Sequence, residues 1–180
     1  MTAAHGPAAH GPAAYDAASI WAILGSVMDP EVPVLSVVEL GIVRDVTVDE
    51  RGAVTVSVTP TYSGCPAMQI IERDIVTALA SGGWRDARVR TVYSPAWTTD
   101  WIGDDARRKL KEFGIAPPPL PGSAVSDAEL VPLRRRSPMV TCPYCGSDHT
   151  TVRSEFGTTA CKAVMFCDGC HQPFELFKAF

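Results

Sequence analysis

The chain has 180 residues, a mass of 19.3 kDa and a formal net charge of −4, with 16 Lys and Arg against 20 Asp and Glu. A hydrophobic fraction of 46% is ordinary for a globular protein and excludes a mostly disordered chain. This charge balance offers no basic surface for nucleic acid, and the longest uncharged run, 53–71, contains Pro60 and Pro66, so no membrane span is expected. Because no Lys or Arg precedes Arg44, a secretory signal would lack its basic start. We expect a cytoplasmic protein whose six cysteines stay reduced.

Residues 1–14 contain a tandem Ala-Ala-His-Gly-Pro repeat that includes His5 and His10. A segment of Gly, Pro and Ala has no core to bury, so the repeat predicts a disordered tail. We interpret its two histidines as solvated side chains rather than metal ligands.

The pattern changes at Tyr15. Apolar residues at helical spacing, preceded by Asp16 as a cap, predict a helix that ends at Met28, because the Asp29-Pro30 step disfavours helix before it. The further expected elements are strands at 42–48 and 53–58, a helix from Pro66 to Gly82-Gly83, a strand at 87–93 and a helix at 99–113. This α-β-β-α-β-α order predicts a small α+β domain over residues 15–114.

Residues 115–139 contain six prolines and the run Arg134-Arg135-Arg136. Such a composition predicts an extended linker, with the arginines as a solvated charge run. The last unit, residues 140–180, holds five of the six cysteines and is predicted to be a separate β domain of zinc-ribbon type.

Two CxxC pairs carry the strongest chemical signal. Cys142 and Cys145 form the first pair, and Cys167 and Cys170 form the second. Each CxxC turn presents two thiolates from one tight loop, and two such loops complete the tetrahedral shell that Zn²⁺ prefers. About forty residues do not hold a fold by core burial alone, so a metal is expected to stabilise this unit.

The identity of this metal stays open at the level of sequence. Four thiolates suit Zn²⁺ and iron–sulfur clusters alike, and the closed CxxC pairing favours one structural zinc per chain. Cys161 and His171 are additional candidate ligands. Cys161 is either a spare thiol on a nearby strand or a fifth cysteine for an iron–sulfur cluster or metal exchange.

Cys65 stands apart from the other cysteines. The Gly-Cys-Pro context predicts that Cys65 caps the second helix, with Pro66 as the first helical residue. The free amides and the positive end of the helix dipole are then expected to lower the pKa of the Cys65 thiol. A nucleophile or a soft-metal ligand fits this position, and a buried inert cysteine is the alternative.

Several segments carry a resemblance to known families. Residues 29–34 (DPEVPV), 39–43 (ELGIV) and 59–68 (TPTYSGCPAM) resemble the iron–sulfur-assembly domain of SufT-like proteins. Five further segments resemble PaaD, also called PaaJ, a family of accessory subunits of the aerobic phenylacetyl-CoA epoxidase system; they are residues 97–101, 114–118, 142–145, 154–162 and 173–178. The resemblance covers Tyr15 to Phe180 and implies an α+β fold followed by a ribbon.

Carried over by position, the resemblance implies site residues in both units. The assembly-domain motif falls on Asp29, Glu31, Glu39, Thr61 and Cys65. The ribbon ligands fall on Cys142, Cys145, Cys167 and Cys170, with Cys161 beside them. Glu39 departs from the family pattern, which often has Asp before Leu-Gly, so its carboxylate reaches one methylene further.

The implied role is a non-catalytic subunit that helps to insert or repair metal centres in its partners, the oxygenase and reductase of the epoxidase system. Since one thiol cannot hold a cluster alone, this role requires a homodimer, a client ligand, or help from Asp29, Glu39 or Cys161. The alternative is a docking subunit whose ribbon presents Phe174, Phe177 and Phe180. An enzyme in its own right is disfavoured, because the chain has no Gly-rich phosphate loop, HExxH motif or Ser-His-Asp set.

Overall fold

The computed structural model describes residues 17–119 and 140–179. Its elements are α1 (Ala17–Leu24), β1 (Val43–Val48), β2 (Val54–Val58), α2 (Met68–Ser81), β3 (Ala87–Thr91), the 3₁₀ helix η1 (Thr99–Trp101), α3 (Asp104–Glu112), β4 (Ile115–Ala116), β5 (Thr150–Ser154), β6 (Lys162–Cys167) and β7 (Pro173–Phe177). The predicted N-terminal tail, the Asp16 cap and most of the predicted linker lie outside the described residues. Within the described ranges, every helix is too short or too polar to cross a lipid bilayer.

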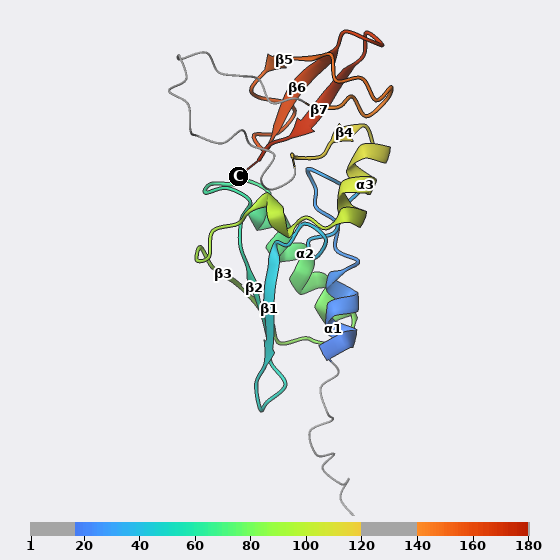
Figure 1. Ribbon diagram of the computed structural model, residues 1–180. Helices are drawn as coiled ribbons and strands as arrows, with labels where there is room; N and C mark the ends of the chain where they lie inside the picture. The colour runs from blue at the N-terminus through green and yellow to red at the C-terminus, as the bar shows by residue number, and fades with distance from the viewer. Residues whose placement is uncertain (1–16, 120–139, 180) are drawn as a thin grey trace, which may run out of the picture.

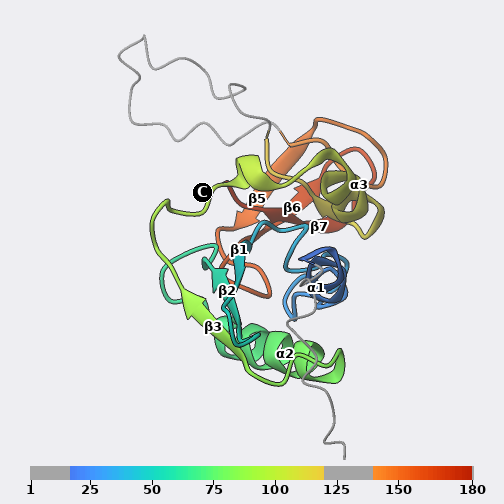
Figure 2. The ribbon, with the colours of Figure 1, turned by 90° about the horizontal axis from the view of Figure 1, so that it is seen from below.

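The N-terminal unit, residues 17–114, is built on a three-stranded sheet in the order β1-β2-β3. β1 and β2 form an antiparallel hairpin, whereas β2 and β3 run parallel. A parallel pair needs a crossover connection, and α2 supplies it. The helices α1 and α2 contact each other and lie together beside the sheet (Figures 1 and 2). The predicted α-β-β-α-β-α order is confirmed.

The first helix is shorter than predicted. α1 ends at Leu24 rather than Met28, because Gly25, Ser26 and Val27 turn back onto the last helical carbonyls. Met28 is then free to form an extended bridge with Ser36. Helix α2 buries an apolar stripe formed by Ile71, Ile75 and Leu79.

The predicted helix over 99–113 is split in two. The Thr98 hydroxyl accepts a hydrogen bond from the Asp100 N–H and caps the short η1, and the chain is extended at Ile102 before α3 begins. The Arg107 side chain stabilises this break by donating to three carbonyls, those of Ile102, Thr99 and Pro118.

The C-terminal sheet has the order β4-β7-β6-β5. The strands β5, β6 and β7 are antiparallel neighbours, and β4 pairs in parallel with β7. The sequence predicts that the linker begins at Ile115, but Ile115 and Ala116 form β4 instead. Gly114, with a φ of 90°, makes the turn that brings the chain from α3 to this sheet edge.

The hydrophobic core of the N-terminal unit extends to two residues of the ribbon, which also has a smaller core of its own. Cys161 and Phe177 belong to the ribbon, residues 140–179, yet they pack into the core of the N-terminal unit. The Phe177 ring lies 6.1 Å from the Trp97 ring, between ring centres. The Trp97 indole N–H in turn donates to the Leu40 carbonyl at 2.9 Å. The ribbon therefore sits directly on the N-terminal unit, as Figure 1 shows.

Candidate metal centre and thiol cluster

The four CxxC cysteines converge at one end of the ribbon. Cys142 and Cys145 lie on the loop before β5, whereas Cys167 ends β6 and Cys170 follows it. The sulfur atoms of all four lie within 4.8 Å of one another. The spacing of the two pairs thus predicted correctly that they meet.

Each CxxC turn depends on a particular backbone conformation. Gly146 has a φ of 76°, a left-handed conformation that suits glycine, and its N–H donates to the Cys142 carbonyl. In the second turn the left-handed residue is His171, with a φ of 60°. Gly169 is needed there for its small size and not for a left-handed conformation, because a Cβ at this position would lie 3.0 Å from the Ser147 hydroxyl oxygen.

These four sulfurs fit a tetrahedral zinc ion. A Zn–S bond of about 2.3 Å requires an S–S edge of about 3.8 Å. The Cys142 and Cys170 sulfurs are 3.8 Å apart, and those of Cys145 and Cys167 are 3.5 Å apart. The ribbon therefore contains a metal site of zinc type, formed by its four cysteines.

The two other ligand candidates of the ribbon lie elsewhere. The His171 ring packs beside Phe166. Cys161 directly precedes β6, and Cys167 ends it. A six-residue strand spans about 20 Å, so Cys161 lies at the opposite end of the strand from the metal site. Its place beside the four ribbon cysteines, which the resemblance implied, is wrong.

Cys65 is not the helix cap that the sequence predicted. Helix α2 begins at Met68 with Ala67 as its cap, two residues later than expected. Burial raises the pKa of the Cys65 thiol, the Ala67 and Met68 N–H groups lower it, and the charges of Glu31 and Asp29 raise it again. The net pKa is raised, so the predicted lowering is wrong: burial and two nearby carboxylates outweigh the amides.

An acidic loop lies beside Cys65. The Asp29 carboxylate accepts hydrogen bonds from the Glu31 and Val32 N–H groups, both at 2.8 Å, and so fixes the loop after α1. Burial raises the pKa of Asp29 despite these bonds. Burial, followed by the charge of Asp29, also raises the pKa of Glu31.

Cys161 reaches this loop from the ribbon. Its sulfur lies 3.7 Å from the Glu31 carboxylate and 3.0 Å from the Thr159 hydroxyl. Burial raises the pKa of the Cys161 thiol to about 11, with Glu31 and Asp29 adding to the effect. We name Asp29, Glu31, Cys65 and Cys161 the interdomain cluster, since it combines both units.

The charges of this cluster act on the hydroxyl of Tyr62. Burial, together with the charges of Cys65, Glu31 and Cys161, raises the pKa of the Tyr62 hydroxyl to about 12. Thr61, the motif residue next to it, is buried.

Among the residues of the assembly-domain motif, Glu39 has separate contacts from those of the interdomain cluster. Its carboxylate accepts hydrogen bonds from the N–H and hydroxyl of Ser36 and pairs with Lys109 of α3. Burial would raise the pKa of Glu39, but the bonds from Lys109 and Ser36 outweigh it and lower the pKa. The longer side chain at this position thus ties the loop before β1 to α3.

Lys162 is a residue that sequence reasoning missed. Its side chain is buried, pairs with Glu175 at 2.9 Å, and donates to the Glu31 carbonyl at 3.3 Å. A lysine is seldom buried unless it is paired. The one hint in the sequence was that Lys162 follows Cys161 within the PaaD-like segment. The pattern of one strand does not show whether a lysine on it will be buried.

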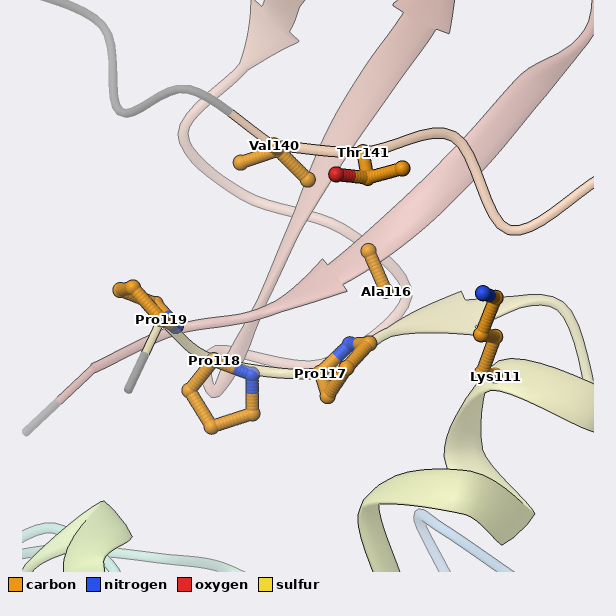
Figure 3. A pocket seen from close by; sticks show the side chains of 7 residues that line it. All are labelled: Lys111, Ala116, Pro117, Pro118, Pro119, Val140 and Thr141. Carbon is orange, nitrogen blue, oxygen red and sulfur yellow. The ribbon is translucent and has the colours of Figure 1, made fainter. Parts of the chain in front are cut away.

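A cavity of about 310 Å³ lies where the two described ranges meet. Figure 3 shows Pro117, Pro118 and Pro119 along one side and Val140 and Thr141 along the other. Among the described residues, its lining includes no carboxylate, imidazole or thiol, so it offers no acid–base or nucleophilic group of these kinds.

Fold and metal site together define an iron–sulfur-assembly-type α+β domain followed by a zinc ribbon. Residues 17–91 match the family described as iron–sulfur cluster assembly protein, and residues 126–178 match the PaaD zinc beta ribbon domain. The chain is 46% identical over 159 residues to an Escherichia coli protein whose name describes it as a component of 1,2-phenylacetyl-CoA epoxidase, covering 88% of this chain and 90% of that protein. The chain belongs to the PaaD family.

Two shorter relatives match only about half of the chain. The Fe-S protein maturation auxiliary factor YitW of Bacillus subtilis is 40% identical and matches 51% of this chain and 90% of its own length. The Fe-S protein maturation auxiliary factor SufT of Staphylococcus aureus is 39% identical and matches 47% of this chain and 96% of its own length. The predicted kinship with SufT-like proteins is thus confirmed.

Proposed function

We propose that the protein is an accessory subunit of a phenylacetyl-CoA epoxidase system that delivers iron to the metal centres of its partners. The carrying observation is the interdomain cluster, in which the Cys161 sulfur lies 3.7 Å from the Glu31 carboxylate and the charges of Glu31 and Asp29 raise the pKa of Cys65. The names of the relatives support this role, because one names an epoxidase component and two name iron–sulfur maturation factors.

The residues of the cluster have separate tasks in this proposal. Asp29 fixes the conformation of the loop after α1, because its carboxylate accepts two backbone N–H hydrogen bonds from that loop. Cys65 is the thiol that takes up the cargo, and it is half-buried, so a client can reach it. Because its pKa is raised, Cys65 stays protonated until a metal ion displaces the proton. The protonated thiol is less reactive than the thiolate, so Cys65 resists oxidation while no metal is bound.

The ribbon has a structural task. One zinc per chain, bound by Cys142, Cys145, Cys167 and Cys170, stabilises the sheet that holds Cys161 and Phe177 against the N-terminal unit. This closed shell has no open position for chemistry. The proposal places the protein in the cytosol, where the thiols stay reduced.

Complementation tests this role. In a strain that lacks the protein, the wild-type chain should restore iron in the purified oxygenase and reductase, and Cys65→Ser should leave both as low as in the deletion strain. Ser63→Ala, at an exposed neighbouring position, is the matched control and should restore iron fully. Full restoration by Cys65→Ser would overturn the proposal.

A docking subunit without metal transfer is the second candidate. The predicted docking side chains do not support it, because Phe174 and Phe177 are buried and Phe180 lies outside the described residues. A different surface does favour it: the exposed rings of Phe113 and Tyr144 line a hollow of about 340 Å³. If docking is the whole function, Tyr144→Ala abolishes co-purification with the oxygenase while Cys65→Ser leaves it and the oxygenase iron unchanged.

A further inference from the structure

Each of the two sheets has two edge strands, and within the described ranges three of these four edges are protected. The strands β1 and β5 each carry a register shift in their pairing with the neighbouring strand. The strand β4 has two residues and leads directly into three successive prolines. Bulges, short strands and prolines all hinder an edge from pairing with another chain.

The fourth edge, β3, has none of these protections. It pairs with β2 over all five of its residues without a register shift, and it contains no proline. It is the outermost strand of its sheet, and β2 is its single strand neighbour in the described part of the chain (Figure 2). The strand β3 is therefore a regular edge whose outer side no strand covers.

The backbone of β3 shows which residues face this outer side. The Asp86 carbonyl accepts a hydrogen bond from β2 at 2.9 Å, and the Val92 N–H donates one to β2 at 2.7 Å. Successive residues direct their backbone groups to alternate sides of a strand, so the even-numbered residues between these two also face β2. The odd-numbered residues, Ala87, Val89 and Thr91, direct their N–H and C=O groups outward.

The side chains give the two faces of this edge different chemistry. On one face of the sheet, the side chains of Arg88 and Arg90 are exposed. On the other face, toward α2, Ala87 and Val89 are half-buried and pack against the core. A strand beside β3 would therefore meet cationic side chains on one face and small apolar side chains on the other.

The two arginines distinguish between a second copy of the chain and another protein. If two β3 edges paired antiparallel about Val89, Arg88 of each copy would lie opposite Arg90 of the other, and like charges directly opposite destabilise a strand pair. Asp86 neutralises little of this charge, because its pair with Arg88 is 3.5 Å long and exposed. The edge thus repels its own copy and attracts an acidic strand.

We propose that β3 is a docking edge to which an extended, acidic segment of a partner protein adds as a fourth strand of the N-terminal sheet. Main-chain hydrogen bonds to Ala87, Val89 and Thr91 supply the affinity. Acidic side chains at every second position of the partner pair with Arg88 and Arg90, and the apolar positions between them cover the face toward α2. This edge shares no residue with the interdomain cluster, so the inference is independent of iron delivery.

Amide hydrogen exchange of the full-length, zinc-loaded protein tests the added strand. The probe is an acetylated, amidated heptapeptide of alternating Val and Glu, and the control peptide has Lys in place of Glu. At a Glu-peptide concentration of about ten times its Kd, exchange of the Val89 and Thr91 N–H groups should slow about tenfold. The Arg88 and Arg90 N–H groups already face β2 and should change much less. Protection without this alternation, or no protection at millimolar peptide, would overturn the inference.

Two variants separate strand addition from a simple charge contact. The double variant Arg88→Glu with Arg90→Glu should weaken binding of the Glu peptide by about tenfold or more and should bind the Lys peptide instead. Arg73→Glu, at an exposed arginine of α2, is the matched control and should leave both affinities unchanged.

The second variant, Ala87→Pro, removes one outward N–H at the first residue of the strand, where proline is tolerated. It keeps both arginines and should still weaken binding by about three- to tenfold, because one hydrogen bond is lost. Thermal unfolding checks that each variant is folded. Wild-type affinity for the Glu peptide in either folded variant would contradict the docking edge.

Discussion

The two groups of thiols in this protein differ in almost every physical respect. The ribbon site has four sulfurs from two short turns, all within 4.8 Å of one another. The interdomain cluster has two sulfurs and two carboxylates, drawn from three stretches of chain and two units. The first is a gathered shell that suits a resident ion. The second is acidic and largely buried, so its thiols hold their protons more tightly than ordinary cysteines do.

The comparison also shows what holds each group in place. Tight local turns position the ribbon cysteines, so the geometry of this site depends mainly on the ribbon itself. The interdomain cluster depends instead on how the ribbon packs against the N-terminal unit, through Phe177 and Lys162. Four predictions test this difference, in order of decreasing effect.

Removing a ribbon ligand should have the largest effect. Structural zinc contributes about 10–16 kcal/mol in small metal-dependent domains, so Cys142→Ser should lose its zinc and unfold the sheet of β5, β6 and β7. Elemental analysis and amide hydrogen exchange measure both effects. Cys161→Ser should keep one zinc per chain. Equal zinc loss in both variants would contradict the separation of the two thiol groups.

Truncating the shared core should come next. Phe177 is 1% exposed and packs on Trp97, so Phe177→Ala should lower the free energy of unfolding by about 3–5 kcal/mol. The matched control is Phe156→Ala, because Phe156 is 70% exposed and its loss should change stability by about 0.5 kcal/mol or less. Denaturant unfolding measures the difference, and similar values for both variants would contradict a shared core.

Removing the buried charge pair should have a smaller effect. The side chains of Lys162 and Glu175 are 6% and 23% exposed, so Lys162→Met should destabilise the protein by about 3 kcal/mol. Arg88→Met removes an exposed pair with Asp86 and should change stability by about 1 kcal/mol or less. If thermal unfolding shows the same shift for both, Lys162 does not hold the units together.

The smallest effect should appear at alkaline pH. The pKa of Cys161 is about 11 in the folded protein against an ordinary value of 9.0, so the folded state holds the thiol proton more tightly. This contribution is fully present below pH 9 and is lost as the pH rises through about 11. Between pH 8 and 11, the wild type should therefore lose up to about 2 kcal/mol relative to Cys161→Val. Parallel unfolding curves at all pH values would contradict the burial of an ionisable thiol beside Glu31.

The sequence predicts best those features that local chemistry determines. The alternation of Val54, Val56 and Val58 gives β2, and the two CxxC turns give the ribbon site, because each signal acts over a few residues. Prediction failed where two local signals compete, as at Gly25, where a turn ends α1 early although the apolar spacing continues.

Long-range contacts explain the remaining failures. The pKa of Cys65 depends on Glu31 and Asp29, which lie on another loop, so the predicted lowering from the helix end was wrong. The position of Cys161 depends on a partner 130 residues away. No pattern in a single sequence indicates such a pair, although family resemblance did mark both residues as part of a motif.

The pairing of β4 with β7 has a consequence for how the protein is made. β4 leaves the ribosome 58 residues before Pro173, the first residue of β7, which is about 3–12 s at ordinary rates of synthesis. During this interval β4 has no strand to pair with, but an edge of two residues is too short to recruit another nascent chain. The contact between Cys161 and Glu31 likewise needs the ribbon to be translated, so a chain that ends before β5 has a complete α/β sheet but lacks this link between the units.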